Sequence, residues 1–177
     1  MSSKSKKGFT IIEVVLVLAI AGLIFLMVFI ALPALQRSQR NTQRGDDLSR
    51  VLTAVNSYQS NNSGQTPFEK SSMSVNANFV KRYIDETCTQ QTDGISYSCS
   101  DSSDQFKDPD GETYKMKYEA DVTADGTANF TAVDHTFHVY TNASCSTEGE
   151  YKVGTGSRQV AIFYVNEGGS IQCNDNH

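Results

Sequence analysis

Residues Lys6-Lys7-Gly8-Phe9-Thr10-Ile11-Ile12-Glu13 lead into a segment from Val14 to Leu35 that contains no charged side chain. Such a segment is long enough to form a helix that crosses the hydrocarbon core of a bilayer. One carboxylate, that of Glu13, stands almost at its start. An acidic side chain within a membrane helix is unfavourable by about 2.5 to 3.5 kcal/mol, so it indicates a functional site with a partner. We expect that partner to be a positive charge on a neighbouring copy of the chain.

Two simpler interpretations of this segment explain less. A secretory signal has an apolar core of about 7 to 15 residues followed by a cleavage site with small residues, whereas this run extends to Leu35. A simple membrane anchor needs about 20 apolar residues, which the segment supplies. An anchor alone leaves Glu13 without a role.

A short basic leader, the sequence Gly-Phe-Thr-x-x-Glu from Gly8 to Glu13, and a hydrophobic helix follow one another in register. This arrangement resembles the class III signal of type IV pilins and related pseudopilins. The resemblance implies cleavage by a prepilin peptidase between Gly8 and Phe9, N-methylation of Phe9, and retention of the helix in the mature protein. It also implies that Glu13 pairs with the α-amino group of Phe9 in the adjacent subunit of a filament.

The charge of the remaining chain indicates its location. From Val51 onward there are 8 Lys and Arg against 17 Asp and Glu, together with four cysteines. Basic residues flank the apolar segment on both sides, so a count of positive charges does not decide the orientation. A polar, acidic region that contains cysteines is typical of an extracytoplasmic domain. The acidic balance also argues against nucleic-acid binding, because affinity for phosphates requires clustered Lys and Arg.

The predicted helix continues past the membrane segment. Its apolar positions recur at spacings of three and four, which predicts one face packed on a domain: Leu48, Val51, Leu52, Val55 and Tyr58. The sequence Asn61-Asn62-Ser63-Gly64, followed by Pro67, predicts the end of the helix. A basic cluster lies around the start of this face and consists of Arg37, Arg40, Arg44 and Arg50. We expect these side chains to form a solvated or headgroup-facing rim of the helix. The alternative is that they form ion pairs with acidic neighbours in a filament.

Two positions are expected to weaken the helix. Pro33 lacks the backbone donor that the helix needs, which predicts a kink or a loosened turn, and Gly45 is a second weak point. In the pilins that the chain resembles, the stretch between a glycine and a proline extends when subunits pack. Gly22 and Pro33 are the matching pair, although Pro33 stands a few residues later than that proline usually does.

Beyond Pro67 the pattern predicts a short helix and then strands. An apolar face formed by Phe79, Val80, Tyr83 and Ile84 predicts a helix over 75–86. Alternation around Tyr114, Met116 and Tyr118 predicts a strand, and further strands are expected at 135–141, 159–165 and 170–173. The sequence Asn166-Glu167-Gly168-Gly169 predicts the turn between the last two. We therefore expect an α+β fold in which a long N-terminal spine helix packs on a small antiparallel sheet of three to four strands, as in pilins.

We therefore expect the chain to consist of four parts. Residues 1–8 are the leader, and 9–35 form the transmembrane and filament-core half of the spine helix. Residues 36–62 form its amphipathic half, and 63–177 form an extracytoplasmic globular domain.

The four cysteines are expected to form disulfides outside the cytoplasm, and four cysteines allow three pairings. We favour the two sequential loops, Cys88 with Cys99 and Cys145 with Cys173, the second being where many pilins carry a bridge. A zinc site is the competing use of these residues. No Cys-x-x-Cys pair occurs, and His135 and His138 would point to opposite faces of a strand, so the ligand geometry is poor.

A second motif covers residues 108–114. Asp108-Pro109-Asp110-Gly111-Glu112-Thr113-Tyr114 is similar to the Asp-Pro-x-Gly-x-x-Tyr turn that leads into the first strand of many pilins. Pro109 fixes φ for a turn and Gly111 provides the permissive position before the strand. Calcium is the alternative, with oxygen ligands from Asp101, Asp104, Asp108, Asp110 and Glu112, although their spacing does not match the loop of an EF-hand. No other cofactor is expected.

Catalysis has no support, because the sequence contains no recognisable nucleophile, base and acid in order, no phosphate loop and no metal-binding helix. The resemblance implies a structural subunit of a type IV pilus, stored in the cytoplasmic membrane and assembled into a surface filament that serves adhesion, motility or DNA uptake. Its expected partners are copies of itself, the prepilin peptidase and the membrane assembly machinery. The alternatives are a pseudopilin of a type II-like secretion system, a minor pilin, and a membrane protein that never polymerises.

Overall fold

The computed structural model describes residues 8–69, 74–76, 78–99, 106–128, 130, 134–147, 149–156 and 158–176. The chain divides into two compact units, Met1–Gln39 and Arg40–His177.

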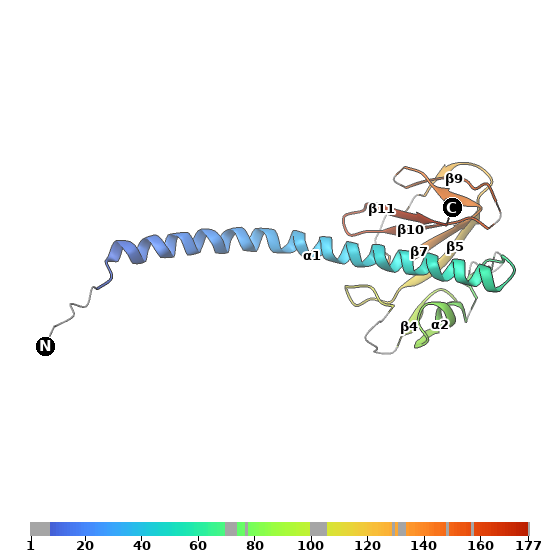
Figure 1. The fold of residues 1–177 in the computed structure, drawn as a ribbon, viewed down its shortest axis with the longest axis horizontal. Coiled ribbons are helices and arrows are strands. Elements are labelled where there is room, and N and C mark those ends of the chain that lie inside the picture. Colours follow the sequence, from blue (N-terminus) through green and yellow to red (C-terminus); the bar gives the residue numbers. More distant parts are fainter. Residues whose placement is uncertain are drawn as a thin grey trace. The chain divides into compact units, whose positions relative to one another are not determined.

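The amino-terminal unit contains the first part of helix α1 (Ile11–Asn61), drawn in blue in Figure 1. In the described part of the chain, α1 is the one helix long and apolar enough to cross a membrane. Its apolar side chains between Ile11 and Leu35 are largely exposed, and a Cβ at Gly22 would meet no atom within 4 Å. The helix continues through Pro33 without a break. A proline removes a single backbone donor, so the helical bonds on either side can maintain the element.

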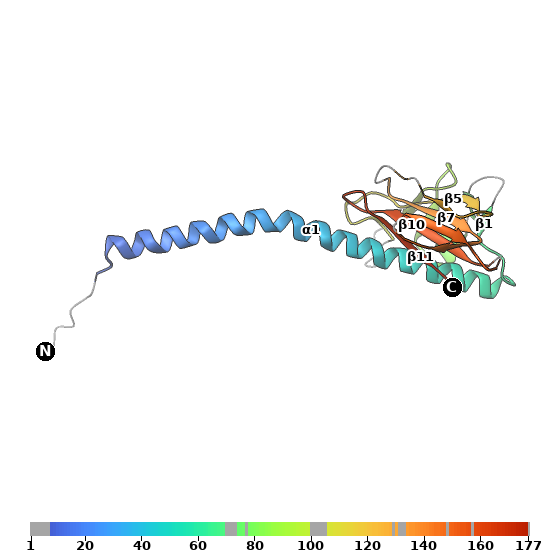
Figure 2. The same cartoon turned by 90° about the horizontal axis from the view of Figure 1, so that it is seen from above.

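The second part of α1 belongs to the carboxyl-terminal unit, where Figures 1 and 2 show it lying along the main sheet. Leu48, Val51, Leu52 and Val55 are buried, which confirms the predicted apolar face. The helix ends as predicted, because Gly64 adopts a φ of 82° and its N–H donates to the carbonyl of Gln59 at 2.7 Å. The helix also continues through Gly45, where a Cβ would lie 3.2 Å from Nε2 of Gln172. Gly45 therefore provides room for a neighbouring strand rather than a break.

The main sheet has four strands in the order β11-β10-β7-β5. These are β5 (Lys115–Asp121), β7 (Thr136–Thr141), β10 (Val160–Val165) and β11 (Ile171–Asp175), close to the predicted positions. The β10–β11 turn is also as predicted, since Asn166 N–H donates to Ser170 O at 2.9 Å and Gly168 and Gly169 have φ of 100° and 86°.

One pairing in this sheet differs from the prediction. β10 pairs antiparallel with β7 and β11, but β5 and β7 are parallel, with Lys115 opposite Thr136. A parallel pair needs a crossover of about a dozen residues or more, and the connection between these two strands, 122–135, meets that requirement. The expectation of a wholly antiparallel sheet was wrong at this pair.

The sheet is covered on both faces. Met116, Phe137, Val139 and Ile162 belong to the core cluster that α1 completes, while Tyr140, Ala161 and Phe163 belong to a second cluster on the opposite face. That face carries a three-stranded sheet in the order β6-β9-β8, made of β6 (Gly126–Thr127), β8 (Ala143–Cys145) and β9 (Glu150–Val153). Strands β7 and β10 are consequently buried along their whole length rather than alternating.

The segment between α1 and the main sheet is less regular than predicted. Helix α2 covers Phe79–Tyr83 only, and Val75, expected to begin it, pairs with Phe68 between β1 (Phe68–Glu69) and β2 (Ser74–Val75). At its end, Ile84 and Asp85 N–H both donate to the carbonyl of Val80, which closes the helix. Strands β3 (Cys88–Gln90) and β4 (Tyr97–Cys99) follow as a separate antiparallel pair.

Candidate assembly site

The predicted assembly residues lie at the start of α1. Phe9 is 91% exposed, and Glu13 is exposed as well. Together with Val14, Val17 and Leu18 they line an open apolar depression of about 210 Å³. Apart from the Glu13 carboxylate, this surface is built from side chains that gain stability by leaving water.

Glu13 is already engaged within its own chain. Thr10 N–H and Thr10 Oγ1 donate to Glu13 Oε2 at 2.8 and 2.9 Å, and Glu13 N–H donates back to Thr10 Oγ1 at 3.4 Å. This is a capping box, in which Thr and Glu three positions apart satisfy backbone donors at a helix start. Thr10-x-x-Glu13 is the sequence signature of a capping box, but no capping box was predicted here. The second carboxylate oxygen, Oε1, accepts no hydrogen bond from any residue that the structure describes, so it is open to a partner.

Residues 3–29 match the prokaryotic N-terminal methylation motif. This motif is the class III signal of type IV pilin-like prepilins. Its span includes Gly8, Phe9 and Glu13, whose roles in cleavage, methylation and pairing stay predictions. It implies processing by a prepilin peptidase and assembly into a pilus-like structure, and with the apolar helix it fits a membrane-anchored prepilin. No curated protein and no solved structure matches the chain. The methylation motif therefore characterises the amino terminus, and the remainder is described by its own contacts.

In the carboxyl-terminal unit, Arg44 on α1 is a fully buried charge, with a side chain that is 0% exposed. Its Nε and Nη2 donate to Oδ2 and Oδ1 of Asp108 at 2.8 and 2.7 Å, and Tyr164 OH donates to Oδ2 at 2.7 Å. Its Nη1 donates to Glu167 Oε1 at 2.9 Å. Arg44 was expected on a solvated rim or against a filament neighbour, and this expectation was wrong because its own domain supplies both carboxylates.

These contacts determine the charge states of the cluster. Burial by itself would raise the pKa of Asp108, but the hydrogen bonds from Arg44 and Tyr164 outweigh it and hold that pKa well below its usual range. The hydrogen bonds that Arg44 donates to Asp108 raise the pKa of Arg44, against the effect of burial. The pair is therefore ionised wherever the protein is folded at ordinary pH. A bidentate arginine and carboxylate pair also fixes the orientation of both side chains.

A second arginine extends the cluster to the β10–β11 turn. Arg40 Nε and Nη2 donate to Oε1 and Oε2 of Glu167 at 2.6 and 2.7 Å, and the hydrogen bond from Arg40 lowers the pKa of Glu167 to about 2. Glu167 N–H donates to Asn41 Oδ1 at 3.2 Å. Arg40, like Arg44, was expected on a rim and instead ties this turn to α1. The predicted basic cluster contains two further arginines. Arg37 is exposed, and Nη2 of Arg50 donates to the carbonyl of Ile84 at 2.7 Å.

The motif at 108–114 forms the predicted turn and adds two contacts to α1. Gly111 N–H donates to Asp108 O at 2.9 Å, and Gly111 has a φ of 99°. Asp108 holds Arg44, and Tyr114 OH donates to Oδ2 of Asp47 at 2.7 Å. Burial raises the pKa of Asp47 to about 6. The first and last residues of the motif thus bind one stretch of the helix.

The same contacts bear on the calcium alternative. Oδ1 and Oδ2 of Asp108 accept from Arg44, whose guanidinium carries the positive charge that a calcium ion would bring. Ligand atoms of Asp108, Asp110 and His135 lie within 4.8 Å of one another, but Asp110 Oδ2 also lies 3.5 Å from Arg44 Nη2. Both carboxylate oxygens of Asp108 are thus engaged by Arg44 in the folded domain, and calcium binding at this loop stays a prediction. Glu112 is exposed, and Asp101 and Asp104 lie outside the described residues.

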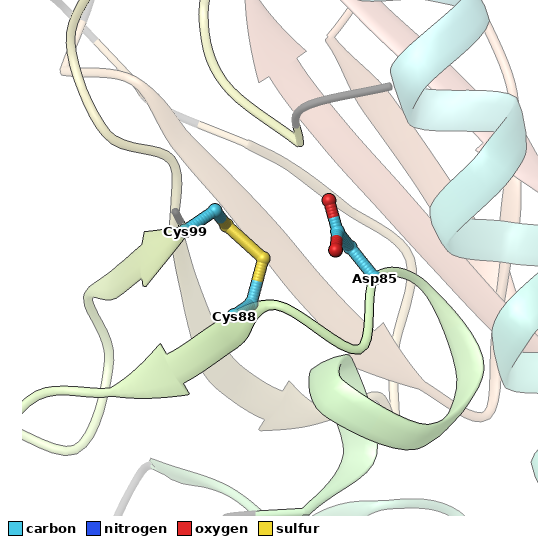
Figure 3. A group of neighbouring side chains, drawn as sticks. All are labelled: Asp85, Cys88 and Cys99. Atoms are coloured by element: carbon cyan, nitrogen blue, oxygen red, sulfur yellow. A yellow bond between two sulfur atoms is a disulfide. The ribbon is translucent and has the colours of Figure 1, made fainter. Parts of the chain in front are cut away.

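The cysteines form the two disulfides that the sequence favoured. Cys88–Cys99 joins opposed residues of β3 and β4, and Cys145–Cys173 joins β8 to β11. Figure 3 shows the Asp85 carboxylate beside the first disulfide. The Asp85 carboxylate accepts hydrogen bonds from the N–H groups of Thr87 and Phe106 at 2.9 and 3.4 Å. It also lies near the two cysteine sulfurs, but these are bonded to each other in the disulfide and are not available as metal ligands. Each loop closure contributes about 2 to 4 kcal/mol.

Proposed function

We propose that the chain is the structural subunit of a type IV pilus filament. The observation that carries this proposal is Glu13 within the methylation motif, next to an exposed apolar helix and with one carboxylate oxygen unbonded by the described residues. A prepilin peptidase would cleave between Gly8 and Phe9, and Phe9 would then be N-methylated. The new α-ammonium group of one subunit would pair with Glu13 of the next.

The assembly chemistry is noncovalent. Once a subunit has left the bilayer, the apolar helices of many copies would bury against one another the side chains that water would otherwise contact, which is favourable by about 25 cal/mol for each Å² kept from water. A charge left unpaired in the resulting low-dielectric core would be strongly unfavourable, so only subunits with Glu13 beside an ammonium group would pack stably. Contacts between different surfaces of identical subunits give an open helical filament when the rotation from one subunit to the next does not close into a ring.

The proposed organisation has four parts. Residues 1–8 are removed, 9–35 form the membrane anchor and filament core, 36–62 form the amphipathic half of the helix, and 63–177 form the exposed domain. The cluster around Arg44 supports this division, because it attaches the domain to residues 40–47 of α1 through buried ionic contacts. Pro33 favours a pilus over a secretion pseudopilus, since pseudopilins commonly lack such a proline, and the helix between Gly22 and Pro33 would extend during packing.

The test is the intact mass, with amino-terminal peptide mapping, of protein sheared from the surface of its native cells. We expect a chain that begins at methylated Phe9 and is lighter by two protons for each of two disulfides. Recovery from membranes alone, with residues 1–8 still attached, would overturn the proposal. Processed protein confined to the periplasm in short assemblies would instead identify a pseudopilin.

A further inference from the structure

A polar pocket lies where the end of α1 meets the segment that leads into α2. It has a volume of about 190 Å³ and is lined by Tyr58, Asn62, Asn76, Asn78, Arg82 and Tyr83, which we call the Asn-Tyr pocket. Among the described residues, its lining contains three amides, two phenols and one guanidinium, and no carboxylate. This composition is unusual for a region with 17 Asp and Glu against 8 Lys and Arg from Val51 onward.

The amides of this pocket have hydrogen-bonding groups to spare. Asn62 Nδ2 donates to Tyr58 O at 2.8 Å and Asn76 Oδ1 accepts from Asn78 N–H at 3.1 Å, while Oδ1 of Asn62 and Nδ2 of Asn76 bind nothing among the described residues. The side chain of Asn78 precedes α2 but makes no capping hydrogen bond. Each amide therefore presents a free donor, a free acceptor or both to the pocket.

The aromatic wall of the pocket is fixed to the core. The rings of Tyr58 and Tyr83 pack edge to face, with their centroids 5.4 Å apart. Both rings also pack against buried Phe79, at centroid distances of 5.8 and 5.9 Å. Arg82 Cζ lies 5.9 Å from the centroid of Tyr83, and its guanidinium has no carboxylate partner among the described residues. A wall of this kind loses little conformational freedom when a ligand binds.

We propose that the Asn-Tyr pocket binds the terminal monosaccharide of a glycan, with preference for a sugar that carries a carboxylate. A sugar hydroxyl both donates and accepts, which matches the free amide groups, and a carboxylate matches the unpaired fork of Arg82. Pockets for drug-sized ligands have volumes of about 300 to 1,000 Å³, so a smaller one suits a single sugar ring. Binding here requires neither processing nor polymerisation, and it is independent of the proposed filament.

A neighbouring cavity provides the matched control. It is lined by Asn56, Gln59, Ser60, Arg158, Gln159 and Asn176, and so also contains several amides and one arginine. Here the amides bind one another, because Asn176 Nδ2 donates to Asn56 Oδ1 at 2.9 Å and Gln59 Nε2 donates to Arg158 O at 2.8 Å. Similar residue types with their groups already satisfied have less to offer a ligand.

The test is ligand-observed saturation-transfer NMR with the full chain in detergent micelles and three free sugars: glucuronate, N-acetylneuraminate and glucose. We expect an acidic sugar to bind with a Kd of about 1 mM, as is usual for so small a ligand. Arg82→Gln should weaken binding of the acidic sugar about tenfold, because a charged hydrogen bond is lost. Asn78→Ala should weaken binding without unfolding the protein, since that side chain makes no hydrogen bond to the residues that the structure describes.

The control variant Arg158→Gln should leave binding unchanged. Equal losses for Arg82→Gln and Arg158→Gln would show general charge attraction and overturn the proposal. The absence of saturation transfer from all three sugars at about 10 mM, well above the expected Kd, would overturn it as well. Equal affinity for glucose and glucuronate would overturn the preference for a carboxylate.

Discussion

Arg44 and Asp108 form a bidentate ion pair in which both side chains are 0% exposed, although the two residues lie 64 positions apart. One is on α1 and the other begins the turn before β5, so the pair joins the helix to the sheet at one defined register. Tyr164 and Glu167 supply further hydrogen bonds to the same two side chains. The attachment of the domain to its helix therefore depends on a buried ionic contact in addition to the apolar core.

Arg44→Met should destabilise the domain by about 3 to 5 kcal/mol, because it leaves the Asp108 carboxylate buried without its partner. The matched control is Arg37→Met, at an exposed arginine of the same helix, which should change the free energy of unfolding by no more than about 0.5 kcal/mol. Denaturant unfolding of both variants in micelles, followed by the fluorescence of the eight tyrosines, measures the difference. Equal stability of the two variants would show that the pair contributes nothing.

The sequence predicted those parts of the fold that follow from local patterns. The spacing of Leu48, Val51, Leu52 and Val55 identified the buried face of α1, and the glycines at 168 and 169 identified the last turn. Both signals act over a few residues, so neither requires knowledge of the tertiary structure.

The sequence-based predictions failed where a contact with a residue distant in the sequence determines the local structure. The local sequence around Arg44 is typical of an exposed arginine, and no local pattern predicts its partner Asp108, 64 residues away. Val75 has a helical neighbourhood in sequence but pairs with Phe68 instead. Thr10 was missed for a different reason, since its capping box with Glu13 is a local signature that could have been recognised. At the candidate site, the roles of Gly8, Phe9 and Glu13 stay predictions, and the structure adds the hydrogen bonds between Thr10 and Glu13.

Asp47→Asn should stabilise the domain at neutral pH. Burial raises the pKa of Asp47 to about 6, above its unfolded value, so its contribution is most favourable at low pH and is lost as pH rises through about 6. An amide oxygen can still accept from Tyr114 OH, while the charge is removed. We expect a gain of about 1 to 3 kcal/mol at pH 7 and little change at pH 4. Denaturant unfolding at the two pH values checks this, and a loss at pH 7 would contradict it.

His138 should also make the stability of the domain fall as pH rises, as Asp47 does. Burial lowers its pKa, but two carboxylates outweigh that effect and raise it: Asp134, whose Oδ2 lies 3.5 Å from Nε2, and Glu119, whose Oε1 lies 2.7 Å from Nδ1. The imidazolium therefore contributes stability that is fully present below the unfolded pKa of about 6.5 and is lost as pH rises through the higher folded value. The ring resonances of His138 should titrate above about 6.5. Glu119→Gln should lower that midpoint, and an unchanged midpoint would exclude Glu119 as a cause.

Glu13→Gln should abolish filaments while leaving the protein in the membrane. A glutamine oxygen can still accept from Thr10 N–H and Oγ1, so the variant keeps the start of α1 and removes only the charge. Thr10→Ala is the complementary control, because it weakens the helix start by about 1 kcal/mol but leaves the carboxylate free to pair with a neighbouring ammonium group. Electron microscopy of sheared cell-surface material, with immunoblots of membranes, distinguishes the two. Filaments in Thr10→Ala but not in Glu13→Gln would assign the role to the charge. The opposite pattern would assign it to the capping box, and normal filaments in Glu13→Gln would exclude the pairing of Glu13 with Phe9.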